Sequence, residues 1–71
     1  MTREDLETWF TYHAPRADQL PKYEAIRAAG LVFAEIVARN TPPSADQSVA
    51  IRKIREAVMI ANASIACERI E

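Results

Sequence analysis

The chain has 71 residues and a formal net charge of −1 at pH 7, and 49% of its residues are hydrophobic. The near-neutral charge argues against a binder of DNA or RNA polymers, which carries a basic stripe or a high isoelectric point. The only cysteine and the only histidine, Cys67 and His13, exclude an intrachain disulfide and are too few ligands for a structural zinc site. With no apolar run of about 18 residues and no signal-peptide pattern, we expect a single cytoplasmic domain without a membrane partner.

The first predicted helix spans residues 2–10. Thr2 is a candidate N-cap with Asp5 three residues later, and the acidic Glu4 and Glu7 also suit a helix N-terminus. A helix of this length is marginal unless it packs against another part of the protein.

The second predicted helix spans residues 17–40. Pro21 fits its first turn, where the missing N–H has no intrahelical partner to lose. Asn40 and the proline pair at residues 42–43 end the helix. Steps of three and four residues give an apolar stripe and a flanking row that widens it: Tyr23, Ile26, Gly30, Phe33 and Val37, then Ala25, Ala29, Val32 and Ile36.

The third predicted helix spans residues 45–68. Ser44 with Gln47 three residues later is a candidate capping box. The short connection before it makes the second and third helices antiparallel neighbours. The apolar stripe comprises Ile51, Ile54, Val58, Ala61 and Ile65, with Ala50, Ala57 and Ile60 beside it. The sequence therefore predicts an all-α fold, with a short N-terminal helix followed by a long antiparallel helical hairpin.

Residues 57–67 contain no charged side chain. A helix that packs on a single neighbour shows charge on its outer face at every turn, so these three turns are expected to be enclosed on more than one side. The alternative is that the chain covers this stretch by itself, but its first helix is only about two turns long. Self-association is the favoured interpretation.

The sequence offers little for catalysis. It has no Gly-rich phosphate loop, no second histidine and no pair of carboxylates placed for acid–base work. Cys67 lies in an apolar stretch and is interpreted as a small buried hydrophobe rather than a nucleophile. We therefore expect neither an enzyme nor a metal or other cofactor.

Residues 9–16 hold three of the five aromatic side chains and the only histidine. A nucleobase is able to stack on Tyr12, and Arg27 of the next helix is able to make forked hydrogen bonds to a phosphate, with Lys22 nearby. For Trp9 and Phe10 we favour docking into the hairpin.

Tyr12, His13 and the basic residues of the third predicted helix each allow two interpretations. Tyr12 either binds a ligand or covers the joint between the first helix and the hairpin. His13 is expected to hydrogen-bond within its loop, although it is retained as a candidate ligand contact. Arg52, Lys53 and Arg55 form a solvated face in preference to an anion site.

Several runs together resemble the phage anti-CBASS cyclic-oligonucleotide sponges, the family of anti-CBASS protein two. The resemblance covers nearly the whole chain from Tyr12 onward. The matching runs are residues 12–15, Gln19, residues 23–27, residues 43–46, residues 53–59 and residues 61–66.

This resemblance implies a compact homohexamer of interlocking trimers. It also implies that the protein binds cyclic dinucleotides such as cyclic GMP-AMP, and cyclic trinucleotides, and sequesters them uncleaved in the host bacterial cytoplasm. The roles of base stacking and phosphate binding then fall on Tyr12 and Arg27, and Arg69 is a candidate for a second site. The competing hypothesis is a helical module that binds a host protein through Trp9, Phe10 and Tyr12.

Overall fold

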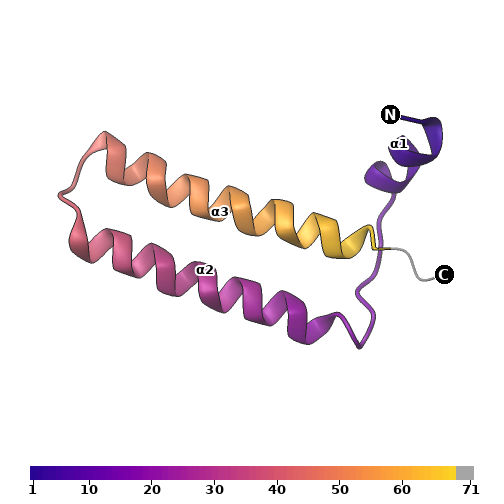
Figure 1. Ribbon diagram of the computed structural model, residues 1–71, viewed down its shortest axis with the longest axis horizontal. Coiled ribbons are helices and arrows are strands. Elements are labelled where there is room, and N and C mark those ends of the chain that lie inside the picture. The colour runs from indigo at the N-terminus through magenta and orange to yellow at the C-terminus, as the bar shows by residue number, and fades with distance from the viewer. Residues whose placement is uncertain (69–71) are drawn as a thin grey trace.

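The computed structural model describes residues 1–68, which form three helices and no strand. Helix α1 comprises Arg3–Phe10, α2 comprises Leu20–Asn40 and α3 comprises Ala45–Ala66. Helices α2 and α3 form a long antiparallel hairpin, and α1 projects from the end of the hairpin at which α3 finishes (Figure 1). The predicted all-helical fold and the hairpin are confirmed.

The predicted helix starts and stops rest on local hydrogen bonds. The Thr2 hydroxyl accepts the Asp5 N–H at 3.1 Å and the Asp5 carboxylate accepts the Thr2 N–H at 3.0 Å, so the capping box of α1 is complete. The Ser44 hydroxyl likewise accepts the Gln47 N–H at 3.1 Å. The predicted N-caps of α1 and α3 are therefore confirmed.

The second half of the predicted box at Ser44 is wrong. The Gln47 side chain does not return to the N-cap backbone but donates to the carbonyl oxygens of Ala38 at 3.2 Å and Thr41 at 3.1 Å. Carbonyls at a helix C-terminus have no intrahelical partner, so this amide satisfies two of them and fastens α3 to the end of α2.

Three helix boundaries differ from the prediction. Helix α1 begins at Arg3 rather than at residue 2, because Thr2 is its N-cap. Helix α2 begins at Leu20 rather than at residue 17, because residues 17–19 form a turn in which Gln19 is the N-cap. Helix α3 ends at Ala66, two residues early, and Cys67 is its C-cap.

The two long helices approach each other closely at Gly30. A β-carbon at this position would lie 2.6 Å from Val58 Cγ2, so only a hydrogen atom fits there. The predicted stripe of α3 is half-buried along its whole length. On α2, by contrast, the expected widening of the apolar face is wrong for the single chain, because Val32 and Ile36 are exposed. One partner helix covers only one stripe.

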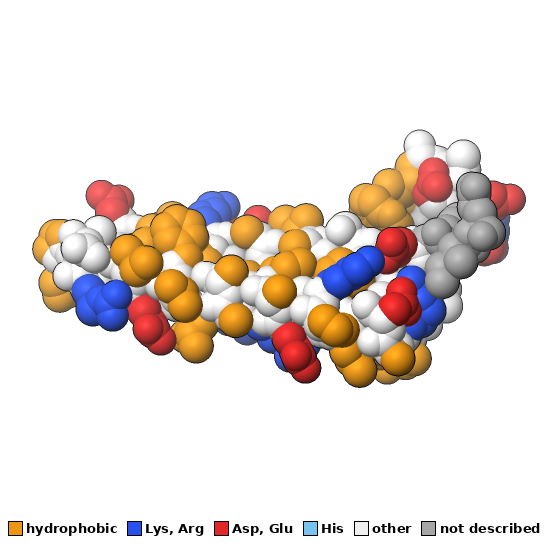
Figure 2. Space-filling view, turned by 60° about the horizontal axis from the view of Figure 1, so that its bottom comes forward, with side chains coloured by type: hydrophobic (Ala, Val, Ile, Leu, Met, Phe, Trp, Pro, Cys, Tyr) orange, Lys and Arg blue, Asp and Glu red, His pale blue; other side chains and the backbone are white. Residues whose placement is uncertain are grey.

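Very little of the described chain is fully buried. Within residues 1–68 the buried set is Tyr23, 9% exposed, and Gln19, 2% exposed. Hydrophobic side chains extend along the surface of the hairpin (Figure 2). The exposed large ones on α2 and α3 are Leu20, Leu31, Val32, Phe33, Ile36, Val49, Met59 and Ile60.

The predicted docking of Trp9 and Phe10 into the hairpin is wrong for the single chain. Trp9 is 63% exposed and Phe10 is 84% exposed, because α1 stands away from the two long helices. Trp9 does line a shallow hollow with Ile60 and Cys67 of the α3 end. Within residues 1–68, no helix is long and apolar enough to cross a membrane.

We predict that Gly30→Ala destabilises the fold despite the higher helix propensity of alanine. Alanine gains about 1 kcal/mol over glycine inside a helix, whereas overpacking costs about 1–3 kcal/mol. Val58 is short and β-branched, and one χ1 rotamer is strongly preferred in a helix, so its side chain does not easily move away from the added methyl group. We therefore expect a net loss of about 1 kcal/mol in the free energy of unfolding, measured by urea denaturation.

The matched control is the double variant Gly30→Ala/Val58→Ala, in which the added methyl group lies 4.0 Å from the β-carbon of residue 58 and the overpacking is relieved. An increase in stability for Gly30→Ala alone would contradict the close approach of the helices.

Candidate functional site

The loop between α1 and α2 is held by the buried side chain of Gln19. Gln19 Nε2 donates to the Ile65 carbonyl oxygen at 2.9 Å, and Gln19 Oε1 accepts the Arg16 N–H at 3.0 Å. The Gln19 carbonyl also accepts the N–H groups of Lys22 and Tyr23. One amide thus joins the loop, the start of α2 and the end of α3.

A second anchor joins this loop to α1. His13 Nε2 lies 2.7 Å from the Thr8 carbonyl oxygen, which requires the ring nitrogen to be the donor. The Cys67 thiol donates to the same carbonyl oxygen at 3.8 Å. His13 is therefore the loop hydrogen-bonder that the sequence predicts. Cys67 is half-buried rather than buried.

Tyr12 directly precedes His13, within the short segment closed by the His13–Thr8 hydrogen bond, and is 85% exposed. The backbone on either side of it is restrained, but its ring is open to solvent. An exposed tyrosine ring is a stacking surface for a flat ligand, because a side chain with two χ angles loses little entropy on binding.

Arg27 lies on α2 and borders a shallow groove between the long helices. Ile51 and Arg55 of α3 line the same groove, together with Leu31 from the next turn of α2. No ion pair within residues 1–68 involves Arg27 or Arg55, and both side chains are exposed. Two guanidinium groups on one groove attract an anion such as a phosphate.

Sequence reasoning missed the contribution of Arg55 to this groove. The sequence predicts a solvated face at residues 52–55, and Lys53 does pair with Glu56 at 3.5 Å across one helical turn. Arg55 points to the other side of α3. The predicted hairpin could have placed Arg55 near Arg27. In an antiparallel helix pair, residues at similar distances before and after the turn lie opposite each other.

The single chain does not bring all the predicted site residues together. Lys22 Nζ lies 3.7 Å from Glu68 Oε2, on a different part of α2 from Arg27. None of the hydrogen bonds or ion pairs of the described chain joins Tyr12 to Arg27. Arg69, the candidate for a second site, lies outside the described residues. The described part of the chain also contains no group of three or more side chains able to hold a metal ion.

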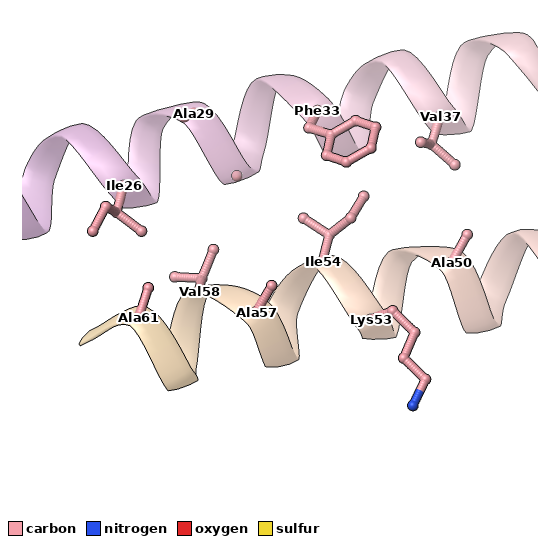
Figure 3. Close-up of a pocket in the computed structure, with 11 residues that line it drawn as sticks. Ile26, Ala29, Phe33, Val37, Ala50, Lys53, Ile54, Ala57, Val58 and Ala61 are labelled. Atoms are coloured by element: carbon pink, nitrogen blue, oxygen red, sulfur yellow. The ribbon is translucent and has the colours of Figure 1, made fainter. Parts of the chain in front are cut away.

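A larger groove of about 600 Å³ runs along the other side of the helix contact. Ile26 of α2 and Ile54 and Val58 of α3 point into the space between the helices, whereas Lys53 points away from it (Figure 3). This apolar groove suits hydrophobic side chains of a protein. Tyr12 and the arginine-lined groove are therefore the candidate sites for a polar ligand.

The comparison with protein families matches the model described as Acb2/Tad1, hairpin domain, over residues 2–66. The chain belongs to the Acb2/Tad1 hairpin-domain family. This is the family of anti-CBASS protein 2, so the resemblance noted in the sequence is confirmed. No curated protein and no solved structure matches the chain.

The family match includes the whole of α1, the anchored loop and both helices of the hairpin. The loop and the arginine-lined groove thus both lie within the family domain.

We predict that Gln19→Ala destabilises the protein by about 2–3 kcal/mol, because it removes two part-buried hydrogen bonds and leaves the Arg16 N–H without its partner, while the Ile65 carbonyl keeps the Glu68 N–H. The matched control is Gln47→Ala, which also removes an amide that donates to backbone carbonyls but is more exposed, and which should cost about 1 kcal/mol. Denaturation of the two variants measures the difference. Equal losses of unfolding free energy in the two variants would show that the Gln19 side chain contributes no more to stability than the Gln47 side chain does.

Proposed function

We propose that the protein binds cyclic oligonucleotide second messengers and sequesters them without cleavage, thereby blocking bacterial CBASS immunity. The ligands are cyclic dinucleotides such as cyclic GMP-AMP, and cyclic trinucleotides. The observation that carries the proposal is the exposed Tyr12 ring on an anchored loop within an Acb2/Tad1 hairpin domain. Since CBASS signalling takes place inside the bacterium, the proposed place of action is the host cytoplasm.

The chemistry of the described residues supports this ligand class. Stacking of a base on an aromatic side chain is worth about 1–3 kcal/mol. Arg27 and Arg55 supply charged donors for the phosphates, and an arginine fork is able to hold two phosphate oxygens at once.

Self-association is the second part of the proposal, with a homohexamer as the expected assembly. Tyr12 and Arg27 are not joined within one chain, and a second copy is able to supply the missing half of the site. A two-fold interface presents both residues twice, which matches the two bases and two phosphates of a cyclic dinucleotide.

Two features of the surface support self-association. The two-helix hairpin leaves its large hydrophobic side chains exposed, including Phe33, Met59 and Ile60. The amide oxygen of Asn62, in the uncharged half of α3, is buried without a hydrogen-bond partner in the described chain. A polar atom of this kind is expected to find its partner in a neighbouring subunit.

The second candidate function is a module that binds a host protein. It is favoured by one observation, the joint exposure of Trp9, Phe10 and Tyr12. A thermal-shift experiment distinguishes the two functions, because only a ligand that binds the native state raises the melting temperature of the protein. An absence of any shift with cyclic dinucleotides and trinucleotides would favour the protein-binding module.

We predict that Tyr12→Ala and Arg27→Ala each weaken cyclic dinucleotide binding by about 10- to 100-fold, because each removes one stacking or charged contact per ligand half. Calorimetric titration measures the affinity. The controls are Tyr12→Phe, which retains the stacking ring, and Arg39→Ala, which removes an exposed arginine near the far end of α2.

Two results would contradict this proposal. Parent-like affinity in both alanine variants would show that the site lies elsewhere. Recovery of a linearised nucleotide after denaturation of the complex would show that the protein cleaves its ligand.

We predict that the protein sediments at six times the mass of one chain and that Phe33→Glu or Ile60→Glu lowers this mass, because burial of a new charge opposes association. Sedimentation equilibrium measures the mass, and circular dichroism reports whether the helices persist. The control is Arg52→Glu, a charge change on an exposed residue of α3. A monomeric parent protein would contradict the assembly.

A further inference from the structure

Three charged side chains from separate parts of the chain meet at the end of the hairpin that bears α1. Glu68 Oε2 lies 3.7 Å from Arg16 Nη2 and 3.7 Å from Lys22 Nζ. Arg16 belongs to the loop that carries Tyr12, Lys22 to the first turn of α2, and Glu68 follows the C-cap of α3. A single carboxylate oxygen thus lies between two cations.

The charges of this cluster cancel while Glu68 is in place. Arg16 Nε also donates to Asp18 Oδ1 at 3.2 Å, and this hydrogen bond is the main reason that the pKa of Asp18 is lowered from its usual value of 3.8. Asp18 therefore stays ionised at neutral pH and neutralises one edge of the guanidinium. The remaining edge of Arg16 and the Lys22 ammonium are neutralised by Glu68.

The contacts of Glu68 are loose and solvent-exposed. Charge-assisted hydrogen bonds are about 2.7–2.9 Å long, so both pairs at 3.7 Å are well beyond that length. Exposed pairs of this kind contribute little to stability. The backbone beneath them is rigid by comparison, because the Arg16 N–H is fixed by the buried Gln19. An incoming anion needs to displace a side chain only.

We infer that Arg16 and Lys22 form an anion site that accepts a phosphodiester of the ligand, and that Glu68 is its internal competitor. The identity of the ligand rests on the function proposed above. Arg16 comes four residues after Tyr12 in the same loop, and Lys22 precedes Arg27 by roughly 7.5 Å of helical rise. The site therefore lies on the same molecular end as the stacking residue.

The competitor gives the site selectivity for polyanions. A free monoanion only replaces one negative charge by another and gains little. A cyclic dinucleotide stacked on Tyr12 through a base brings a phosphate to the site at a high effective concentration, and this phosphate displaces Glu68.

The test is Glu68→Gln, which keeps the size of the side chain and removes its charge. Calorimetry with a cyclic dinucleotide should show binding about three- to fivefold tighter than in the parent, the gain expected when exposed competing ion pairs are released. The matched control is Glu56→Gln, which removes a carboxylate that pairs with Lys53 and changes the net charge equally. It should leave the affinity within about twofold of the parent, since a lone exposed charge has a small effect on binding elsewhere.

Two further variants complete the test. Arg16→Gln and Lys22→Gln should each weaken binding about threefold or more, and either one combined with Glu68→Gln should abolish the gain. Parent-like or weaker binding by Glu68→Gln, or an equal gain in Glu56→Gln, would overturn the inference.

A separate probe distinguishes this inference from the proposed function. Titration with inorganic pyrophosphate, followed by the NMR signals of the Arg16 and Lys22 side chains, tests the anion site alone. If no cyclic oligonucleotide binds but Glu68→Gln binds pyrophosphate more tightly than Glu56→Gln does, the proposed function is contradicted and the anion site is supported. If cyclic dinucleotides bind through Tyr12 and Arg27 with no effect of Glu68, the function stands and the inference fails.

Discussion

The hydrogen bonds of the Gln19 amide hold together the loop and the helix ends that surround the proposed binding site. The side chain is 2% exposed and joins the Arg16 N–H to the Ile65 carbonyl oxygen. The ion pair between Arg16 and Glu68, which also joins this loop to the end of α3, is longer and more exposed. Because Tyr12 and His13 lie on the same loop, a local amide network determines where an exposed aromatic ring is presented. The binding surface thus depends on a residue that does not itself face a ligand.

The second constraint is that two helices make only one line of contact. Burial of one stripe leaves the remaining faces of α2 and α3 open, which is why the described chain buries almost no hydrophobic side chain completely. A short chain of this kind gains stability mainly from partner subunits when it has neither disulfide nor metal. In the proposed assembly the same association that covers Phe33 and Ile60 also brings a second Tyr12 and Arg27 to the ligand.

The sequence was most informative where the physics is local. The N-caps at Thr2 and Ser44 and the proline-rich connection follow from residue type and spacing, and they gave the helices and the hairpin. The placement of Trp9 failed because residue type and spacing do not determine how α1 is oriented relative to the hairpin, and α1 stands away from it. Gln19 and Arg55 were missed because their partners lie on α3 and α2, far away in sequence, and only the register of the hairpin brings them together.

The close approach at Gly30 has a consequence for the relation between the two grooves. Gly30, Ile54 and Val58 line both the apolar groove and the arginine-lined groove, so the partition between them is a single layer of side chains. In the proposed assembly, a subunit seated in the apolar groove contacts the same three residues that line the groove of Arg27 and Arg55. If occupancy of one groove changes the helix spacing, the effect between the two grooves is reciprocal by thermodynamic necessity.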